Sequence, residues 1–258
     1  MSTCKLTLVQ THLAWEDPSA NLLHFDQRLQ DIGDTDLIVL PEMFSTGFSM
    51  NSRALAESMD GNTVTWLKEK AAVHNATVCG SAIIEDGGAY YNRLVAASPG
   101  GDVIKYDKRH LFRMSTENEN YTAGADRLTF QAGAATIFPQ VCYDLRFPVF
   151  SRNDLGYDVL LYIANWPARR RDHWTTLLRA RAIENQCYVV GLNRIGSDGN
   201  NVDYSGDSAV IDFNGATMLS LGNKDTVTSL EIDMTLLETY REQFPVWKDA
   251  DVFHLGDR

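Results

Sequence analysis

The chain has 258 residues and a formal net charge of −11 at pH 7; 44% of its residues are hydrophobic and 22% are charged. This length and composition predict a single α/β domain over residues 1–258 with a sizeable core. Nonspecific binding to nucleic acid or to an anionic membrane surface requires a basic patch, so the negative charge argues against both. No apolar run approaches the length of a membrane span.

The first residues and the cysteines predict a cytoplasmic protein. The sequence leads directly into a strand-like alternation at residues 6–9, without the apolar region of a signal peptide. The four cysteines are widely separated and form no Cys-x-x-Cys pair, so we expect reduced thiols. Cys4, Cys79 and Cys187 lie in apolar, strand-like runs and are assigned to the core.

In the first half of the chain, strand-like segments alternate with helix-like ones. A helix is predicted from Pro18, with Leu22, Phe25, Leu29 and Ile32 on one face, and a second helix over residues 63–74. Strands are predicted at residues 4–10, 36–40, 77–84, 90–97 and 103–106. The largely apolar run 36–40 is typical of a strand that is buried on both faces.

The second half continues the alternation and ends in an apolar tail. Strands are predicted near Leu128 and at residues 136–142, 159–164, 187–192, 208–213 and 227–232. Helices are predicted after a capping Asp172 and over residues 235–243. Many strands with few helices indicate layered sheets covered by helices. The tail, residues 244–258, is too apolar for a free end, so it packs on its own domain or contacts a partner subunit.

Residues 140–148, Gln-Val-Cys-Tyr-Asp-Leu-Arg-Phe-Pro, place Cys142 at a corner between a strand and the first turn of a helix. Backbone N–H groups at such a corner favour an anion, so we expect a lowered thiol pKa and a place for an oxyanion. An unpaired cysteine is more often a buried apolar residue, so this stretch alone leaves both interpretations open.

Polar residues also follow two other apolar strands, at Glu42 and at Lys108. Binding and catalysis gather at strand ends in open α/β sheets, so these side chains can converge on Cys142. Each residue alone is weak evidence, because a Glu after a Pro and a Lys in a basic run are usually solvated.

In this order, Glu42, Lys108 and Cys142 resemble the catalytic residues of the nitrilase superfamily of carbon–nitrogen hydrolases. The resemblance spans nearly the whole chain, through residues 40–44, 108–112, 142–148, 164–167, 173–174, 179–182, 185–186 and 206–208. Within the superfamily the chain is most similar to the omega-amidase branch, which cleaves the terminal amide of dicarboxylic acid monoamides such as 2-oxoglutaramate and succinamate. The resemblance implies an α-β-β-α sandwich and a homodimer.

It also implies a role for each matching residue. Cys142 corresponds to the nucleophile, Glu42 to the general base and acid, and Lys108 to the cation that stabilises the tetrahedral intermediate. The backbone N–H of Tyr143 is expected to help hold the oxyanion. This chemistry suits an amide, since a soft nucleophile and one proton carrier divide a difficult hydrolysis into two easier steps.

The superfamily has a second glutamate after the lysine, seven residues before a loop glycine. Counting back from Gly124 gives Glu117, which is expected to orient Lys108 or the substrate amide. Glu119 lies close enough to remain an alternative, and either residue can be a solvated loop charge.

The sequence indicates a small anionic amide as substrate. One arginine of the run Arg169, Arg170 and Arg171 can grip a carboxylate through a bidentate pair, although a solvated loop is as good an interpretation for any single one. Phe48, Tyr91 and Trp166 are candidates for an apolar pocket wall, and each is equally acceptable as core.

Other functions remain open. A nitrilase or an N-carbamyl amide hydrolase would use the same three residues, and a non-catalytic binding module would have no reason to keep a costly buried charge pair. His110 and His173 stand at no recognisable spacing from Cys142, and no set of residues has metal-ligand spacing. We therefore expect no metal and no cofactor.

Overall fold

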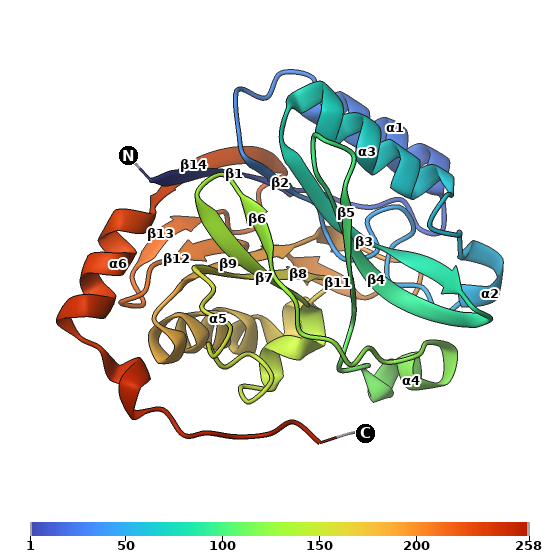
Figure 1. Cartoon of the computed structure of the whole chain (residues 1–258). Helices are drawn as coiled ribbons and strands as arrows, with labels where there is room; N and C mark the ends of the chain where they lie inside the picture. Colours follow the sequence, from blue (N-terminus) through green and yellow to red (C-terminus); the bar gives the residue numbers. More distant parts are fainter. Residues whose placement is uncertain (1, 257–258) are drawn as a thin grey trace.

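Two six-stranded β-sheets are stacked face to face in the computed structural model, which describes residues 2–256 (Figure 1). The first sheet has the order β14 (Thr226–Asp233), β1 (Thr3–Gln10), β2 (Leu37–Val39), β3 (Thr77–Asp86), β4 (Ala89–Ala97) and β5 (Val103–Asp107). The second has the order β13 (Thr217–Ser220), β12 (Ala209–Ile211), β9 (Tyr188–Asn193), β8 (Val159–Ala164), β7 (Ala135–Val141) and β6 (Phe130–Ala132).

Helices cover the outer faces of both sheets and complete the predicted α-β-β-α sandwich. The long helices α1 (Pro18–Leu29) and α3 (Asn62–His74) lie on the first sheet, and α5 (Arg171–Asn185) lies on the second (Figure 1). Helix α6 (Met234–Gln243) follows β14 at one end of the sandwich. The short helices α2 (Ser52–Leu55) and α4 (Glu117–Asn120) belong to connecting loops. None of the helices in residues 2–256 has the length and apolar character that a membrane crossing requires.

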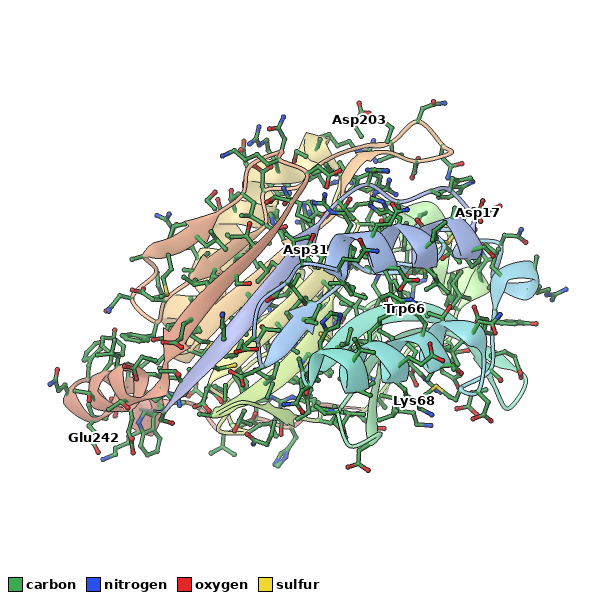
Figure 2. All side chains as sticks on the ribbon, turned by 90° about the horizontal axis from the view of Figure 1, so that it is seen from above. Asp17, Asp31, Trp66, Lys68, Asp203 and Glu242 are labelled. Atoms are coloured by element: carbon green, nitrogen blue, oxygen red, sulfur yellow. The ribbon has the colours of Figure 1, made fainter. Side chains whose placement is uncertain are left out.

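The sequence of α1 explains where it starts and which face it buries. The Asp17 side chain caps the helix by accepting the N–H of Ala20 at 2.9 Å, and Pro18 occupies the first turn. Phe25 and Leu29 are buried against the sheet as predicted. Figure 2 shows α1 and α3 side by side, and Trp66 of α3 donates its indole N–H to Asp26 of α1 at 2.8 Å.

Acidic side chains lie at distant points of the surface. Four exposed examples labelled in Figure 2 lie at distant points of the molecule, on or beside α1, on a hairpin and on α6: Asp17, Asp31, Asp203 and Glu242.

Each sheet has a parallel centre that is buried on both faces. Strands β1, β2 and β3 are mutually parallel, as are β7, β8 and β9, and every residue of β2 and β8 is buried. Strand β4 is antiparallel to both β3 and β5, so β5 runs in the same direction as β2. The residues that follow β2 and β5 therefore emerge at one edge of the first sheet.

The segment after Cys142 differs from the prediction of a regular helix. Residues Cys142–Arg146 form only a 3₁₀-helix, η2, and Pro148 follows within two residues. A proline disfavours helical conformation in the residue before it, which explains why the turn does not extend. The helix predicted after a capping Asp172 instead starts at Arg171 without a side-chain cap, and Asp172 lies in its first turn.

Several smaller elements were not predicted from the sequence. Strand β13 was not predicted, and the strand expected near Leu128 starts at Phe130. A hairpin of β10 (Ile195–Ser197) and β11 (Asp203–Ser205) forms a separate two-stranded sheet. The remaining 3₁₀-helices are η1 (Arg113–Ser115), η3 (Ala168–Arg170) and η4 (Val246–Asp249). These elements are short and lack a strong periodic pattern.

The C-terminal tail packs in part on its own domain. Gln186 donates to the carbonyl of Phe244 at 2.7 Å, and Arg109 donates to the carbonyl of Gly256 at 3.3 Å. The side chains of Phe244 and Trp247 nevertheless remain more than half exposed. Residue 1 and the last two residues of the predicted domain and tail, 257 and 258, lie outside the described residues.

Candidate active site

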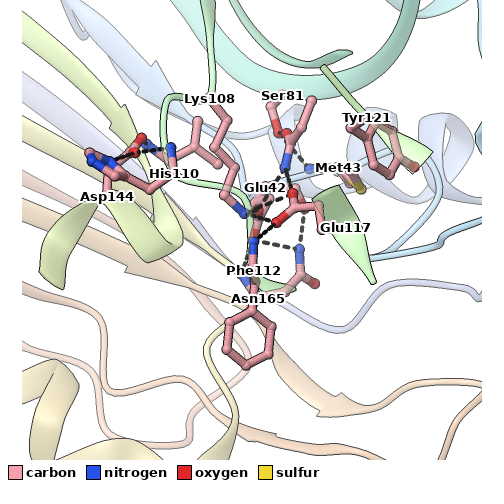
Figure 3. Close-up of polar contacts among 12 residues, drawn as sticks. Glu42, Met43, Ser81, Lys108, His110, Phe112, Glu117, Tyr121, Asp144 and Asn165 are labelled. Atoms are coloured by element: carbon pink, nitrogen blue, oxygen red, sulfur yellow. Dashed lines mark hydrogen bonds and ion pairs between the residues drawn. The ribbon is translucent and has the colours of Figure 1, made fainter. Parts of the chain in front are cut away.

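Glu42 follows β2 and is fully buried. Its Oε1 accepts hydrogen bonds from Lys108 Nζ and from Asn92 Nδ2, both at 2.8 Å, and its Oε2 accepts the backbone N–H of Asn165 at 2.7 Å (Figure 3). Lys108 comes from the end of β5 and Asn165 from the end of β8, so one carboxylate joins the two sheets.

Lys108 is held between two carboxylates in the same buried region. Its Nζ donates to Oε1 of Glu42 at 2.8 Å and to both oxygens of Glu117 at 2.9 Å. Burial alone would lower the pKa of Lys108, but the negative charges of Glu117 and Glu42 outweigh burial and hold this pKa above its ordinary value. The lysine therefore stays protonated and keeps its donors.

Glu117 is the glutamate that faces Lys108, and Glu119 is exposed. The Glu117 carboxylate also accepts the backbone N–H of Phe112 at 2.6 Å and Asn92 Nδ2 at 3.1 Å. Burial raises the pKa of Glu117, and the nearby Lys108 opposes this rise. We call Glu42, Asn92, Lys108 and Glu117 the charged cluster.

Cys142 lies directly after β7, and 8% of its surface is exposed. Its backbone is left-handed, with φ of 47°, a conformation that most L-residues avoid and that is common at functional turns. Burial, and next to it the charge of Glu42, raise the pKa of the thiol well above its ordinary value, while Lys108 opposes the rise. The expectation of a lowered pKa is thus wrong, because burial outweighs the local backbone field.

Asp144 fixes this turn to the segment that carries Lys108. Its fully buried carboxylate accepts Val141 N at 3.0 Å, the Tyr106 hydroxyl at 2.7 Å, and both the backbone N–H and Nδ1 of His110, at 2.9 and 2.7 Å. The His110 ring also stacks on Phe147 at a centroid distance of 3.9 Å. We call Tyr106, His110 and Asp144 the Asp144 cluster; His110 thus bonds to Asp144 and takes part in the support of the turn.

A cavity of about 510 Å³ opens over Cys142 and Lys108. The predicted pocket residues Phe48, Tyr143, Trp166, Arg169 and Arg170 all line it. Tyr91 is absent from this lining, and its ring lies 4.9 Å from the guanidinium of Arg93. Cys142, Lys108 of the charged cluster and an aromatic wall therefore line one cavity.

Three arginines gather on one side of this cavity: Arg146, Arg169 and Arg170. Arg146 lies 4.8 Å from the ring of Trp166, and Arg170 lies 5.4 Å from the ring of Phe112. Burial, together with the charges of Arg169 and Arg146, lowers the pKa of Arg170. Among residues 2–256, no carboxylate forms a salt bridge with any of these three arginines. Arg171 in contrast pairs with Asp207 at 2.7 Å.

Sequence reasoning missed the contributions of Asn92, Asp144 and Arg146. Asn92 is a fully buried polar residue of β4, and a buried polar side chain requires a hydrogen-bond partner. Arg146 lies in the segment that carries the family resemblance, yet only the fold shows that it lines the cavity. Within the described part of the chain, no group of three or more His, Cys, Asp and Glu side chains is arranged to hold a metal ion.

Comparison with known proteins gives consistent matches over almost the full length. The model of the carbon-nitrogen hydrolase family matches residues 5–242. Omega-amidase YafV of Escherichia coli is 48% identical, with 99% of this chain and 100% of that protein covered. A 2-oxoglutaramate amidase of Bacillus subtilis is 33% identical over 95% of this chain and 96% of its own length.

A solved structure agrees with these matches. The crystal structure of a CN-hydrolase superfamily protein from Xanthomonas campestris, which has an arsenic adduct in its active site, superposes with a TM-score of 0.97. The two sequences are 43% identical, and the match covers 99% of this chain and 100% of the other.

Proposed function

The chain belongs to the carbon–nitrogen hydrolase family, and we propose that it cleaves the terminal amide of small dicarboxylic acid monoamides, of the 2-oxoglutaramate or succinamate type, to the acid and ammonia. The observation that carries the proposal is the shared cavity, in which Cys142 stands beside a buried Glu42–Lys108 ion pair of 2.8 Å. Full-length similarity to an omega-amidase supports the substrate class.

Glu42 acts as the proton carrier in our mechanism. The raised pKa of Cys142 keeps the thiol protonated, so sulfur can attack the amide carbon only as Glu42 removes its proton. A hydrogen bond with Glu42 also contributes to that raised pKa. Glu42 then protonates the departing ammonia, and later takes a proton from the water that cleaves the thioester.

Lys108 and the backbone N–H of Tyr143 stabilise the oxyanion of the tetrahedral intermediate. Lys108 is fully buried and carries a fixed positive charge, so its field acts where little water can screen it. Glu117 holds the Lys108 ammonium with two contacts of 2.9 Å and so sets its position. A cysteine thioester forms and is hydrolysed without the help of a cofactor.

The three arginines of the cavity select a substrate that carries a carboxylate. Arg146, Arg169 and Arg170 concentrate positive charge, and no salt bridge to a carboxylate of residues 2–256 neutralises it. A carboxylate two or three carbons from the amide can therefore be bound while the amide reaches Cys142. Equal kcat/KM for succinamate and for a neutral amide of the same length, such as butyramide, would remove this assignment.

The test of the function is ammonia release from a panel of dicarboxylate monoamides. We expect turnover of 2-oxoglutaramate and succinamate by the wild-type protein and none by Cys142→Ala, whose cavity is otherwise intact. Matched nitriles and N-carbamyl compounds belong in the same panel. Turnover of these compounds with no release from the monoamides would contradict the proposed reaction.

We propose a homodimer in which the C-terminal tail takes part. Phe244 and Trp247 of the tail are 55% and 56% exposed, and Ile183 of α5 is 50% exposed. Large apolar side chains on neighbouring surface segments favour burial against a second copy. Trp247→Asp should shift the protein toward monomer in size-exclusion chromatography with light scattering, and an unchanged mass would argue against this role.

We place the enzyme in the cytoplasm. All four cysteines are free and buried, and the core positions predicted for Cys4, Cys79 and Cys187 are confirmed. Free thiols persist in a reducing compartment, which supports this location. Cell fractionation would test it.

A further inference from the structure

Asn165 presents a buried oxygen that has no hydrogen-bond partner. The residue follows β8, is 3% exposed, and lines the same cavity as Cys142. Its Oδ1 accepts no hydrogen bond from any group in residues 2–256. A buried acceptor without a donor costs free energy, so its position beside a reaction centre calls for an explanation.

The orientation of the Asn165 amide is fixed by its other atoms. Nδ2 donates to the backbone carbonyl of Glu42 at 2.6 Å and lies 3.4 Å from Glu42 Oε2. Both neighbours are acceptors, so turning the amide around would place two oxygens against each other. Oδ1 is therefore the atom without a partner, and Figure 3 shows it directed away from Glu42.

Asn92, a member of the charged cluster, provides a contrast to Asn165. Its Nδ2 also donates to Glu42, at 2.8 Å, but its Oδ1 accepts the hydroxyl of Ser81 at 2.8 Å. Asn92 is absent from the lining of the cavity. Two asparagines thus support the same carboxylate, and only the one at the cavity keeps a free acceptor.

We propose that Asn165 Oδ1 accepts an N–H of the substrate carboxamide and so makes the site selective for amides. This inference rests on the proposed function. A carboxamide has two N–H donors, and an ester or a carboxylate has none on its leaving group. Asn165 contacts Glu42 through its backbone N–H and its Nδ2, so the residue stands beside the carboxylate that delivers the proton to the leaving nitrogen.

The same contact would strengthen during the reaction. When the C–N bond of the tetrahedral intermediate breaks, Glu42 gives its proton to the nitrogen, and ammonia leaves with the bond's electron pair as the carbonyl forms again. The nitrogen becomes more positive before it departs, and a hydrogen bond from a charged donor is stronger than one from a neutral donor. The Asn165 oxygen therefore contributes to kcat/KM for amides and has no matching partner in an ester.

The test compares succinamate with monomethyl succinate, which carries the same acid and presents no N–H. We expect Asn165→Ala to lower kcat/KM for the amide about tenfold more than for the ester, the effect of one lost hydrogen bond. Asn165→Asp keeps an acceptor oxygen but loses the donor to Glu42. It should reduce both rates and retain the amide-to-ester ratio within about threefold.

Asn92→Ala is the matched control, because it disturbs Glu42 without removing a group of the cavity. It should lower both rates by a similar factor. An unchanged ratio in Asn165→Ala, or an equal change in Asn92→Ala, would overturn this inference alone. If Asn165→Ala does not fold, a loss of the amide-to-ester preference in Asn165→Asp overturns the inference. A wild-type enzyme that cleaves the ester but no amide overturns the proposed function as well.

Discussion

Two buried clusters of polar side chains, the charged cluster and the Asp144 cluster, meet at the end of β5. Their carboxylates are neutralised or hydrogen-bonded in different ways. In the charged cluster, two carboxylates share the single ammonium of Lys108. In the Asp144 cluster, one carboxylate accepts four hydrogen bonds. The charged cluster borders the cavity through Lys108, while no member of the Asp144 cluster lines the cavity.

The difference shows how the charged cluster can take part in proton transfer while the Asp144 cluster only holds the turn of Cys142 in position. Burial and the excess negative charge of the charged cluster raise the pKa of the Cys142 thiol, and the same negative charge keeps Lys108 protonated, so proton transfer stays possible. The fully bonded Asp144 holds the turn of Cys142 against the strand of Lys108 and has no acceptor left for a substrate. Substitutions in the charged cluster should therefore lower the catalytic rate more than substitutions in the Asp144 cluster.

Lys108→Met should have the largest effect, on activity and on stability. It removes an oxyanion donor, which lowers kcat about 10³-fold. It also leaves Glu42 and Glu117 buried without a cation, which destabilises the fold by about 3–5 kcal/mol at neutral pH. Steady-state kinetics and denaturant unfolding measure both effects.

The double variant Lys108→Met/Glu117→Gln serves as its control. It removes one of the two uncompensated charges, so it should regain part of the stability but none of the activity. Equal stability of the two variants would show that the carboxylates do not repel each other in the fold.

The pH dependence of Cys142 alkylation gives the next largest effect. Because its pKa lies well above the ordinary value, the thiolate population should still rise about tenfold per pH unit between about pH 7 and pH 9. Iodoacetamide modification of the folded wild-type protein should accelerate about 100-fold over that range. A rate that is already constant near pH 7 would indicate a preformed thiolate and contradict the role of Glu42 as the base.

Glu117→Gln should lower kcat about 10- to 100-fold, because a neutral amide holds the Lys108 ammonium less firmly. The raised pKa of Glu117 adds a second signature. The carboxylate loses its charge as the pH falls through a pKa above the ordinary value, so the wild-type acid limb should lie higher than for an exposed Glu. Exposed Glu119→Gln is the control and should keep wild-type kinetics; full activity of Glu117→Gln would end this assignment.

Their positions at strand ends made Glu42, Lys108 and Cys142 candidates in the sequence, and the family resemblance assigned their roles. Each follows a buried or partly buried strand. The directions of β2 and β5 bring Glu42 and Lys108 to one edge of the first sheet, and Cys142 follows β7 of the second sheet. A strand that is apolar throughout, such as β8, is visible in the sequence because both of its faces must be covered.

The hydrogen-bond partners of Glu42 were harder to predict, because they lie far from it in the sequence and only the fold brings them together. Asn92 reaches Glu42 across fifty residues of sequence and Asn165 across 123. The pKa of Cys142 was predicted in the wrong direction, because a corner motif gives the local backbone field and does not give the depth of burial. Arg146 could not be picked out as a cavity residue for a similar reason, because its place in the lining depends on the shape of the cavity.

Asp144→Asn tests whether the supporting cluster acts on catalysis only through position. The new amide N–H would face at least one of the donors Val141 N and His110 N, so the turn of Cys142 should shift. We expect kcat to fall about tenfold with an almost unchanged KM, because a small misplacement of reacting groups affects the chemical step. A fall as large as that of Lys108→Met would mean that Asp144 belongs with the charged cluster.

Tyr106→Phe should have the smallest effect and sets the lower limit of the comparison. It removes one of four donors to Asp144, and the hydroxyl it deletes lies at 2.7 Å from that carboxylate. The remaining three bonds still hold Val141 and His110, so kcat should stay within about threefold of wild type while stability falls by about 1–3 kcal/mol. Because Tyr106 also precedes Lys108 on β5, a large loss of kcat at normal stability would show that the two clusters share one function and that their separation is wrong.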